Sequence, residues 1–170
     1  MPTLVHPSEQ YKVSYIGALR EFQKEGRQGE VEVQRIIHDF AAFVDNLRRR
    51  ETDEPEYGRV RETFFWLVDD GQYIGRVSIR HELNERLEKL GGHIGYEIRP
   101  TKRRRGYGKL ILALALPEAR KLGLKRALIT CDSSNIGSRK IIEANGGQLM
   151  DETLLPGRDV PTRRYWIELP

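Results

Sequence analysis

A basic stretch that contains two glycines constrains this chain more than any other feature of its sequence. It runs Arg103-Arg104-Arg105-Gly106-Tyr107-Gly108-Lys109. A strand-like run over 93–99 precedes it and ends at Pro100, while the apolar residues after Gly108 have helical spacing. Because glycine permits unusual φ angles and close backbone approach, we expect unpaired N–H groups at a helix start that bind a phosphate or pyrophosphate.

Two other glycine-rich phosphate motifs fit these residues poorly. A P-loop requires Ser or Thr after Gly-Lys, and Leu110 stands there. A dinucleotide fingerprint requires a third glycine where Ile111 stands. Asp132 follows at a distance that such a fingerprint would accept, but the missing glycine disfavours that interpretation.

The order of motifs resembles the GCN5-related N-acetyltransferase (GNAT) superfamily. Arg103-x-x-Gly106-x-Gly108 is followed by an expected strand over 127–132 and by Asn135-x-x-Ser138, and the likeness covers most of 73–169. The resemblance implies an α/β (α+β) fold whose mixed central sheet has about six to seven strands, with about four helices on both faces. At 170 residues, we expect one acetyltransferase domain over 1–170.

The resemblance also implies an activity and a cofactor site. Family members are acyltransferases, and this chain is expected to be an N-acetyltransferase that moves the acetyl group of acetyl-coenzyme A to a primary amine by direct attack in a ternary complex. In the family, backbone amides of the glycine signature bind the pyrophosphate, and the preceding strand binds the pantetheine arm. The expected cofactor-binding residues are Ile98, Arg99, Arg103, Arg104, Arg105, Gly106, Tyr107, Gly108, Lys109, Asn135 and Ser138. Asn135 alternatively serves only as a helix cap.

Acetyl transfer needs a base that takes the proton of the amine, and the thiolate must leave either protonated by an acid or unaided. His81, Glu82 and His93 lie at strand ends expected near the cleft and are the candidate bases, with a purely structural role as the alternative for each. Many family members place a proton-donating tyrosine on the helix after the Asn-x-x-Ser stretch, and here that position is Ile142. Ser138 is the remaining candidate donor. The alternative is unaided departure, since a thiol pKa of about 8.5 makes the thiolate a fair leaving group.

Charge and cysteine content restrict the partners. The net charge of +4 is partly concentrated in Lys102–Arg105, so an anionic cofactor explains it and no nucleic-acid partner is expected. The single cysteine, Cys131, excludes an internal disulfide, and the four histidines lack metal-ligand spacing, so we expect no metal. Cys131 reads as a small core residue, with a covalent acetyl-cysteine intermediate as the alternative.

The longest apolar run, 110–116, is too short to cross a bilayer, and the N-terminus lacks the pattern of a signal peptide. We therefore expect a cytoplasmic protein without membrane contact. The acceptor stays open between a small-molecule amine and a protein N-terminus. The acidic loop 51–61 could attract a cationic amine, with an ordinary loop that faces water as the alternative. A homodimer is possible. The main alternative function is a non-catalytic module on the same fold that binds or senses coenzyme A.

Hydrophobic periodicity predicts the remaining elements. We expect helices over 11–26 and 31–50, a hairpin of strands 64–68 and 73–79, and a helix after Gly108 that Pro117 bends or interrupts. Residues 127–131 read as a buried parallel strand, 136–144 as a helix, and 148–154 with 162–169 as a final hairpin. Gly95 indicates a bulge or a close backbone approach in its strand.

Overall fold

The computed structural model describes residues 1–29 and 31–170, and in these residues the chain forms seven strands, six α-helices and two short 3-10 helices. The strands are β1 (Thr3–Val5), β2 (Glu62–Asp69), β3 (Gln72–Arg80), β4 (Ile94–Ile98), β5 (Arg126–Asp132), β6 (Gln148–Thr153) and β7 (Thr162–Glu168). The helices are α1 (Lys12–Lys24), α2 (Val33–His38), α3 (Phe40–Arg49), α4 (Glu85–Lys89), α5 (Tyr107–Lys121) and α6 (Ile136–Ala144), with η1 (Glu9–Tyr11) and η2 (Pro100–Lys102).

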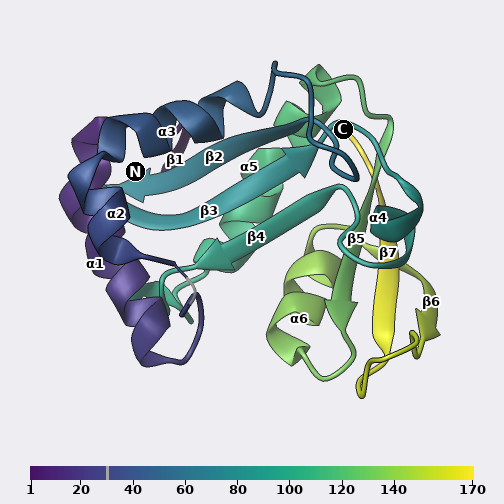
Figure 1. Cartoon of the computed structure of the whole chain (residues 1–170). Coiled ribbons are helices and arrows are strands. Elements are labelled where there is room, and N and C mark those ends of the chain that lie inside the picture. Colours follow the sequence, from purple (N-terminus) through teal and green to yellow (C-terminus); the bar gives the residue numbers. More distant parts are fainter. Residues whose placement is uncertain (30) are drawn as a thin grey trace.

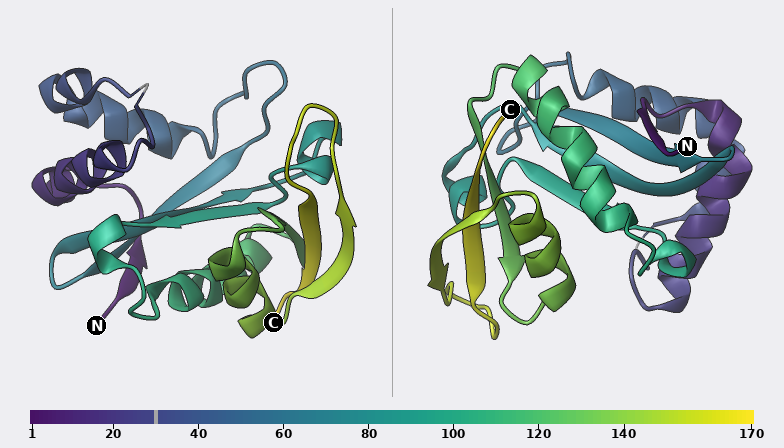
Figure 2. Two further views of the ribbon diagram at one scale, coloured as in Figure 1. Left: turned by 90° about the horizontal axis from the view of Figure 1, so that it is seen from below. Right: turned by 180° about the vertical axis from the view of Figure 1, so that it is seen from behind.

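The strands are divided between two antiparallel sheets. The first sheet has the order β1-β2-β3-β4 and the second has the order β5-β7-β6. Helices cover both faces of the first sheet (Figures 1 and 2), and the expected α/β fold class is confirmed. The expectation of a parallel strand at 127–131 is wrong, because β5 pairs antiparallel with β7 from Arg126↔Glu168 to Asp132↔Thr162.

The two faces of the first sheet pack against different helices. Alternate side chains of a strand point to opposite faces, so Trp66 and Val68 of β2 pack with α1 and α3, whereas Phe65 and Leu67 pack with α5. Figure 2 shows α1, α2 and α3 gathered over one end of their face and α5 on the opposite face. The far end of the α1–α3 face is thereby left without a covering long helix.

Strands β4 and β5 meet at one corner and then diverge. The His93 N–H donates to the Leu128 carbonyl at 2.7 Å, and the Leu128 N–H donates to Nδ1 of the His93 ring at 2.9 Å. Gly92 and Ile129 form an isolated bridge beside them. Figure 1 shows the two strands leaving this corner in different directions. Beyond the corner, β4 is an edge strand with one unpaired side.

Residues 33–49 form two helices, not the single helix expected over 31–50. Asp39 leaves the helical conformation, with φ −133° and ψ 68°, and its carboxylate accepts a hydrogen bond from the Ala42 N–H at 3.1 Å. An aspartate in this position caps a new helix, which is the reason that α2 ends and α3 begins here.

Helix α5 continues through Pro117, so the expected interruption is wrong. Proline removes the donor that would have bonded the carbonyl of Ala113 four residues earlier. Ala113 and Pro117 are both exposed, whereas Ile111, Leu112 and Ala115 face the core. Water can therefore satisfy the Ala113 carbonyl, and the helix tolerates the proline on its solvent side.

Candidate active site

The N-terminus of α5 is an open cradle of backbone donors. Gly106 precedes the helix with a left-handed φ of 85°, Arg104 also has a positive φ of 59°, and the first helical bond runs from the Leu110 N–H to the Gly106 carbonyl at 3.1 Å. Within residues 1–29 and 31–170, no hydrogen bond is donated by a backbone N–H of residues 104–109. These donors and the positive end of the helix dipole are suited to a diphosphate.

The two glycines of the cradle serve different purposes. A Cβ on Gly106 would meet no atom within 4 Å, so its requirement is the left-handed backbone. Gly108 is helical, and a Cβ there would lie 2.5 Å from Cδ1 of Ile141 on α6. Gly108 therefore permits close packing of α5 against α6, a reason that differs from the ligand approach expected from sequence.

The side chains around the cradle differ in their contacts, and only some of them are free to bind an anion. Arg103 turns toward α1, where it pairs with Glu25 at 2.9 Å, and its Nε donates to the Ile98 carbonyl at 3.2 Å. The Tyr107 hydroxyl donates to Asp69 at 2.8 Å, and this hydrogen bond raises the pKa of Tyr107. Three further side chains are exposed beside the open N–H groups and are available to an anion: Arg104, Arg105 and Lys109.

The open edge of β4 faces β5 across a cavity of about 320 Å³, which we call the inter-sheet cavity. The register from Gly75↔Ile98 to Ile79↔Ile94 shows no shift, so the expected bulge at Gly95 is absent. The backbone N–H of Arg99 donates to the Ile74 carbonyl on β3. In an antiparallel strand, successive residues direct their backbone N–H groups to opposite sides, so those of Tyr96 and Ile98 point to the open edge. The cavity lining includes Ile94, Gly95, Tyr96, Ile129, Cys131, Asn135 and Ser138.

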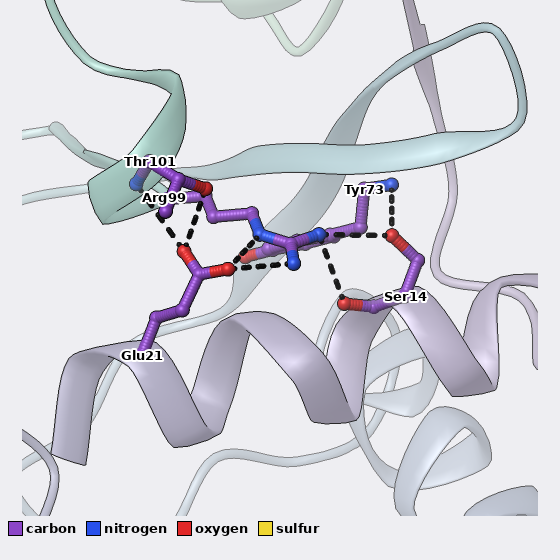
Figure 3. A network of polar contacts seen from close by, with 5 residues as sticks. All are labelled: Ser14, Glu21, Tyr73, Arg99 and Thr101. Atoms are coloured by element: carbon purple, nitrogen blue, oxygen red, sulfur yellow. Dashed lines mark hydrogen bonds and ion pairs between the residues drawn. The ribbon is translucent and has the colours of Figure 1, made fainter. Parts of the chain in front are cut away.

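The side chain of Arg99 lies against α1, between Glu21 and Ser14 (Figure 3), and does not line the inter-sheet cavity. Its Nη2 lies 2.6 Å from Oε1 of Glu21, and its Nη1 lies 3.2 Å from the hydroxyl of Ser14. Thr101 donates to the same carboxylate from its N–H at 3.2 Å and its hydroxyl at 2.9 Å. The guanidinium thus connects α1 to the end of β4 through these hydrogen bonds and the ion pair. The backbone N–H of Arg99 donates to the Ile74 carbonyl.

Asn135, Ser138 and Tyr96 come together in the inter-sheet cavity. The Asn135 side chain accepts from the Ser138 N–H at 3.0 Å, so it caps α6 as the sequence alternative predicted. The Ser138 hydroxyl lies 2.9 Å from the Tyr96 hydroxyl. Burial raises the pKa of Tyr96 to about 12, so its hydroxyl stays protonated at neutral pH. Ile142, at the position of the family's tyrosine, is fully buried in the core.

Sequence reasoning missed Tyr96. The available signal was its position in the middle of the strand expected to bind the pantetheine arm, where alternation sends its side chain to the face that α5 covers. Nothing local in the sequence indicates that Ser138, more than forty residues away in the chain, meets its hydroxyl, since |i−j| is 42 for this pair.

The three candidate bases are not brought together. His93 is 7% exposed, and its Nδ1 is occupied by the Leu128 N–H. Burial, with Arg80 and Arg126 nearby, lowers the pKa of His93 to about 4. His81 lies 2.7 Å from the Thr63 hydroxyl, and Glu82 is exposed. His81, Glu82 and His93 line neither the inter-sheet cavity nor the second cavity described next.

A second cavity, of about 480 Å³, lies on the face of the first sheet that α1–α3 leave uncovered, and we call it the sheet-face cavity. Its floor is made by β2, β3 and β4, and its rim by the segment around Arg59 and by α4. The lining residues are Arg50, Arg59, Val60, Glu62, Phe64, Arg76, Ser78, Arg80, Arg86, Leu87, Gly95, Tyr96 and Glu97. Arg80, Gly95 and Tyr96 also line the inter-sheet cavity. The two cavities therefore adjoin at the open edge of β4.

In the part of the chain that the structure describes, no three His, Cys, Asp or Glu side chains are grouped so that they could hold a metal ion. No helix among those residues has the length and apolar character needed to span a bilayer.

Residues 19–148 match the model of the acetyltransferase (GNAT) domain family. The chain belongs to this family. No curated protein sequence matches it. The resemblance inferred from Arg103, Gly106 and Gly108 is thereby confirmed, and the cradle and two cavities belong to a GNAT acetyltransferase fold.

Solved structures with the same fold include acetyltransferases with bound cofactor. RimJ of Mycobacterium smegmatis, in complex with a coenzyme A disulfide, superposes with a TM-score of 0.72 at 16% identity, over 98% of this chain and 81% of that one. The microcin C7 self-immunity acetyltransferase MccE, in complex with acetyl-coenzyme A and AMP, has a TM-score of 0.70 at 14% identity, over 99% and 92%. A Salmonella typhimurium enzyme that modifies the N-terminal serine of a ribosomal subunit protein has a TM-score of 0.66 at 14% identity, over 99% and 95%.

Proposed function

We propose that this GNAT protein is an N-acetyltransferase that moves the acetyl group of acetyl-coenzyme A directly to a primary amine while both substrates are bound. The observation that carries the proposal is that the inter-sheet and sheet-face cavities share Arg80, Gly95 and Tyr96. Direct transfer requires two sites that open onto one point, and holding both reactants there supplies on the order of 7–11 kcal/mol of the barrier in favourable cases.

Each part of acetyl-coenzyme A has a matching feature. The diphosphate would accept hydrogen bonds from the open N–H groups of residues 104–109, and the pantetheine arm would pair with the open edge of β4. The cradle and the inter-sheet cavity are joined by α6, since Ile141 packs on Gly108 while Ser138 lines the cavity. The thioester would then lie beside Tyr96, within reach of an amine in the sheet-face cavity.

Tyr96 is assigned the role of hydrogen-bond donor to the departing thiolate. Its pKa of about 12 is roughly 3.5 units above the thiol's value of about 8.5, so complete proton transfer would be uphill by about 5 kcal/mol. A hydrogen bond from the hydroxyl stabilises the thiolate without that cost. Ser138, 2.9 Å from the hydroxyl, orients it.

Cys131 lines the inter-sheet cavity but is poorly suited to form an acetyl-enzyme. The thiolate is the nucleophilic form of cysteine, and burial raises the pKa of Cys131. This supports direct attack by the amine over the covalent alternative.

We assign the base to Glu62, a carboxylate of the sheet-face cavity. One of its oxygens is 2.7 Å from Arg50, while the other has only a loose contact of 3.6 Å with Arg80, which lies where the cavities adjoin. This second oxygen retains the capacity to accept the proton of the amine, directly or through a water molecule. Glu97, the other carboxylate in the lining, binds Arg76 at 2.7 Å and Gln28 at 2.9 Å through one oxygen. Its second oxygen is 3.7 Å from Arg27, which lies outside the cavity lining, whereas the second oxygen of Glu62 lies beside Arg80 where the cavities adjoin.

The experiment is initial-rate kinetics of thiol release from acetyl-coenzyme A with a panel of primary amines, varying both substrates. Intersecting double-reciprocal lines are expected, because both substrates must be bound before transfer. Parallel lines would contradict direct transfer. Tight binding of acetyl-coenzyme A with no turnover on any amine would instead favour the module that only binds or senses coenzyme A.

A further inference from the structure

The sheet-face cavity carries an excess of positive charge. Five arginines and two glutamates line it, which leaves three formal positive charges unbalanced within the lining. The arginines come from separate parts of the chain: Arg50, Arg59, Arg76, Arg80 and Arg86. A cavity with this lining repels a cationic amine and attracts a molecule that brings negative charge.

The two glutamates cannot neutralise the whole set. Glu62 is shared between Arg50 at 2.7 Å and Arg80 at 3.6 Å. Glu97 is 2.7 Å from Arg76 and 3.7 Å from Arg27, which lies outside the cavity lining.

Arg86 is the cavity arginine best placed to bind an anion, since Arg80 donates to the carbonyls of Gly91 and Gly92 at 3.0 and 2.9 Å. Arg86 is exposed on α4 and forms no ion pair with any side chain that the structure describes. Burial lowers the pKa of Arg80, and the neighbouring cations Arg86, Arg50 and Arg76 lower it further, against the opposing effect of Glu62. Several guanidinium groups therefore oppose one another in this cavity, and a bound anion would relieve that repulsion.

The acidic loop 51–61 offsets one of the three positive charges of the cavity. Glu56 pairs with the lining residue Arg59 at 3.3 Å, whereas Glu54 pairs at 3.2 Å with Arg61, which lies outside the lining. Two formal positive charges remain. The loop residues that line the cavity are Arg59 and Val60. Asp53, Glu54 and Glu56 line a separate pocket that adjoins this cavity at Arg50 and Arg59. That this loop attracts a cationic amine stays a prediction from the sequence.

From these contacts we infer that the acceptor of acetyl transfer is a small amine that also carries an anionic group, either a carboxylate or a phosphate. The inference rests on the proposed N-acetyltransferase function and names its substrate class. A cavity of about 480 Å³ has the size of a small-molecule site. Guanidinium groups bind carboxylate and phosphate through paired hydrogen bonds, so the anionic group contacts Arg86 and its neighbours while the amine reaches Tyr96.

The first test compares matched amines as acceptors. The carboxylate set is γ-aminobutyrate, its amide and putrescine, and the phosphate pair is phosphoethanolamine and ethanolamine. We expect at least one anionic member to have a kcat/KM about tenfold or more above its uncharged and cationic counterparts, as one charge-assisted hydrogen bond provides. The advantage should shrink as salt is added. The two sets distinguish a carboxylate from a phosphate as the preferred group.

The second test compares two variants on the same helix. Arg86→Met should raise KM for the preferred anionic amine about tenfold, with kcat, KM for acetyl-coenzyme A and KM for the neutral counterpart unchanged. Lys89→Met is the matched control, because it removes the same charge from α4 at a side chain that pairs with Glu85 outside the cavity. It should leave all constants unchanged.

Three outcomes would overturn the inference while leaving N-acetyl transfer intact. These are higher activity on putrescine or the neutral amines, higher activity on an acidic peptide with a free N-terminus than on every small amine, and equal effects of Arg86→Met on the anionic amine and its neutral counterpart. Absence of turnover with every amine would reject the proposed N-acetyltransferase function together with this inference.

Discussion

The cradle of backbone donors at the start of α5 and the sheet-face cavity are built in different ways. The cradle consists of backbone N–H groups from one contiguous stretch, 104–109, whose direction depends on the positive φ angles of Arg104 and Gly106. The sheet-face cavity consists of side chains from β2, β3, β4, α4 and the segment 50–60, which meet only when the sheet has formed.

This difference separates two kinds of recognition in one fold. A backbone cradle needs only a local conformation, and many side chains around it can vary without loss of its donors. A cavity of arginine and glutamate side chains depends on the identity of each residue. We therefore attribute binding of the common cofactor to the cradle and choice of the acceptor to the sheet-face cavity, with Tyr96 where the inter-sheet and sheet-face cavities adjoin.

The largest effect is expected at the backbone of the cradle. Gly106→Val places a β-branched residue at φ 85°, a strain of about 1–3 kcal/mol that is relieved only by turning the N–H groups away from the ligand. Calorimetry should show acetyl-coenzyme A affinity lowered by about tenfold to a hundredfold.

Gly157→Val is the matched control for this variant. Gly157 has a similar φ of 76° and open space around it, and it lies in the loop between β6 and β7. This variant should lose stability but keep its cofactor affinity. Undiminished affinity in Gly106→Val would show that the cradle does not depend on this backbone conformation.

A smaller effect is expected where the cavities adjoin. Tyr96→Phe removes only the hydroxyl, and we expect kcat to fall about tenfold, the value of one charge-assisted hydrogen bond, with both KM values unchanged. Because burial raises the pKa of Tyr96 to about 12, the wild-type kcat should show no alkaline limb from this group between pH 7 and about pH 10. An unchanged kcat in the variant would remove Tyr96 from the reaction.

A variant of Arg99 tests whether its side chain stabilises the fold without contacting the cofactor. Arg99→Met should lower stability by about 2 kcal/mol, because it leaves Glu21 without its main partner, while KM for acetyl-coenzyme A changes less than about threefold. A much larger change in KM would mean that the guanidinium contacts the cofactor after all.

The same ion pair predicts a pH dependence. Burial alone would raise the pKa of Glu21, but hydrogen bonds from Arg99 and Thr101 outweigh it and lower the pKa. The stabilisation is then fully present above the ordinary glutamate pKa of about 4.3 and is lost as the pH falls through the lowered value of the folded state. Thermal denaturation should show the difference in Tm between wild type and Arg99→Met shrinking below about pH 4. A difference that grows on acidification would contradict the assignment.

The smallest effect is expected on the solvent side of α5. Pro117→Ala restores a backbone donor but also restores freedom to the unfolded chain, and these changes oppose each other. We expect the free energy of unfolding to change by less than about 1 kcal/mol, measured by urea denaturation. A gain well above this would mean that the proline strains the helix.

Local features were predictable from the sequence. The turn at Asp70 and Gly71 has φ angles of 47° and 71°, as the Asp-Gly pair predicts for a tight hairpin, and Asn135 caps α6. Gly106 precedes the helix with its predicted special backbone. In each case the conformation depends on one or two neighbouring residues.

Features that depend on distant contacts were not predictable in this way. The apolar run of β5 fits a parallel or an antiparallel strand equally, and its partner β7 lies far along the chain. No site was assigned to Arg80 and Arg86 from the sequence, and they line one cavity only because the fold brings β3 and α4 together. His93 reads as a candidate base, and only the contact with the Leu128 N–H shows that its Nδ1 is occupied at the corner between the sheets.

A crystal structure of the protein with coenzyme A tests the division of roles between the cradle and the two cavities. We expect the diphosphate oxygens to accept hydrogen bonds from the N–H groups of residues 104–109, and the thiol sulfur to lie within hydrogen-bonding distance of the Tyr96 hydroxyl. A diphosphate bound instead among Arg50, Arg80 and Arg86 would contradict the division between cradle and sheet-face cavity. A sulfur remote from Tyr96 would contradict direct transfer at the point where the two cavities adjoin.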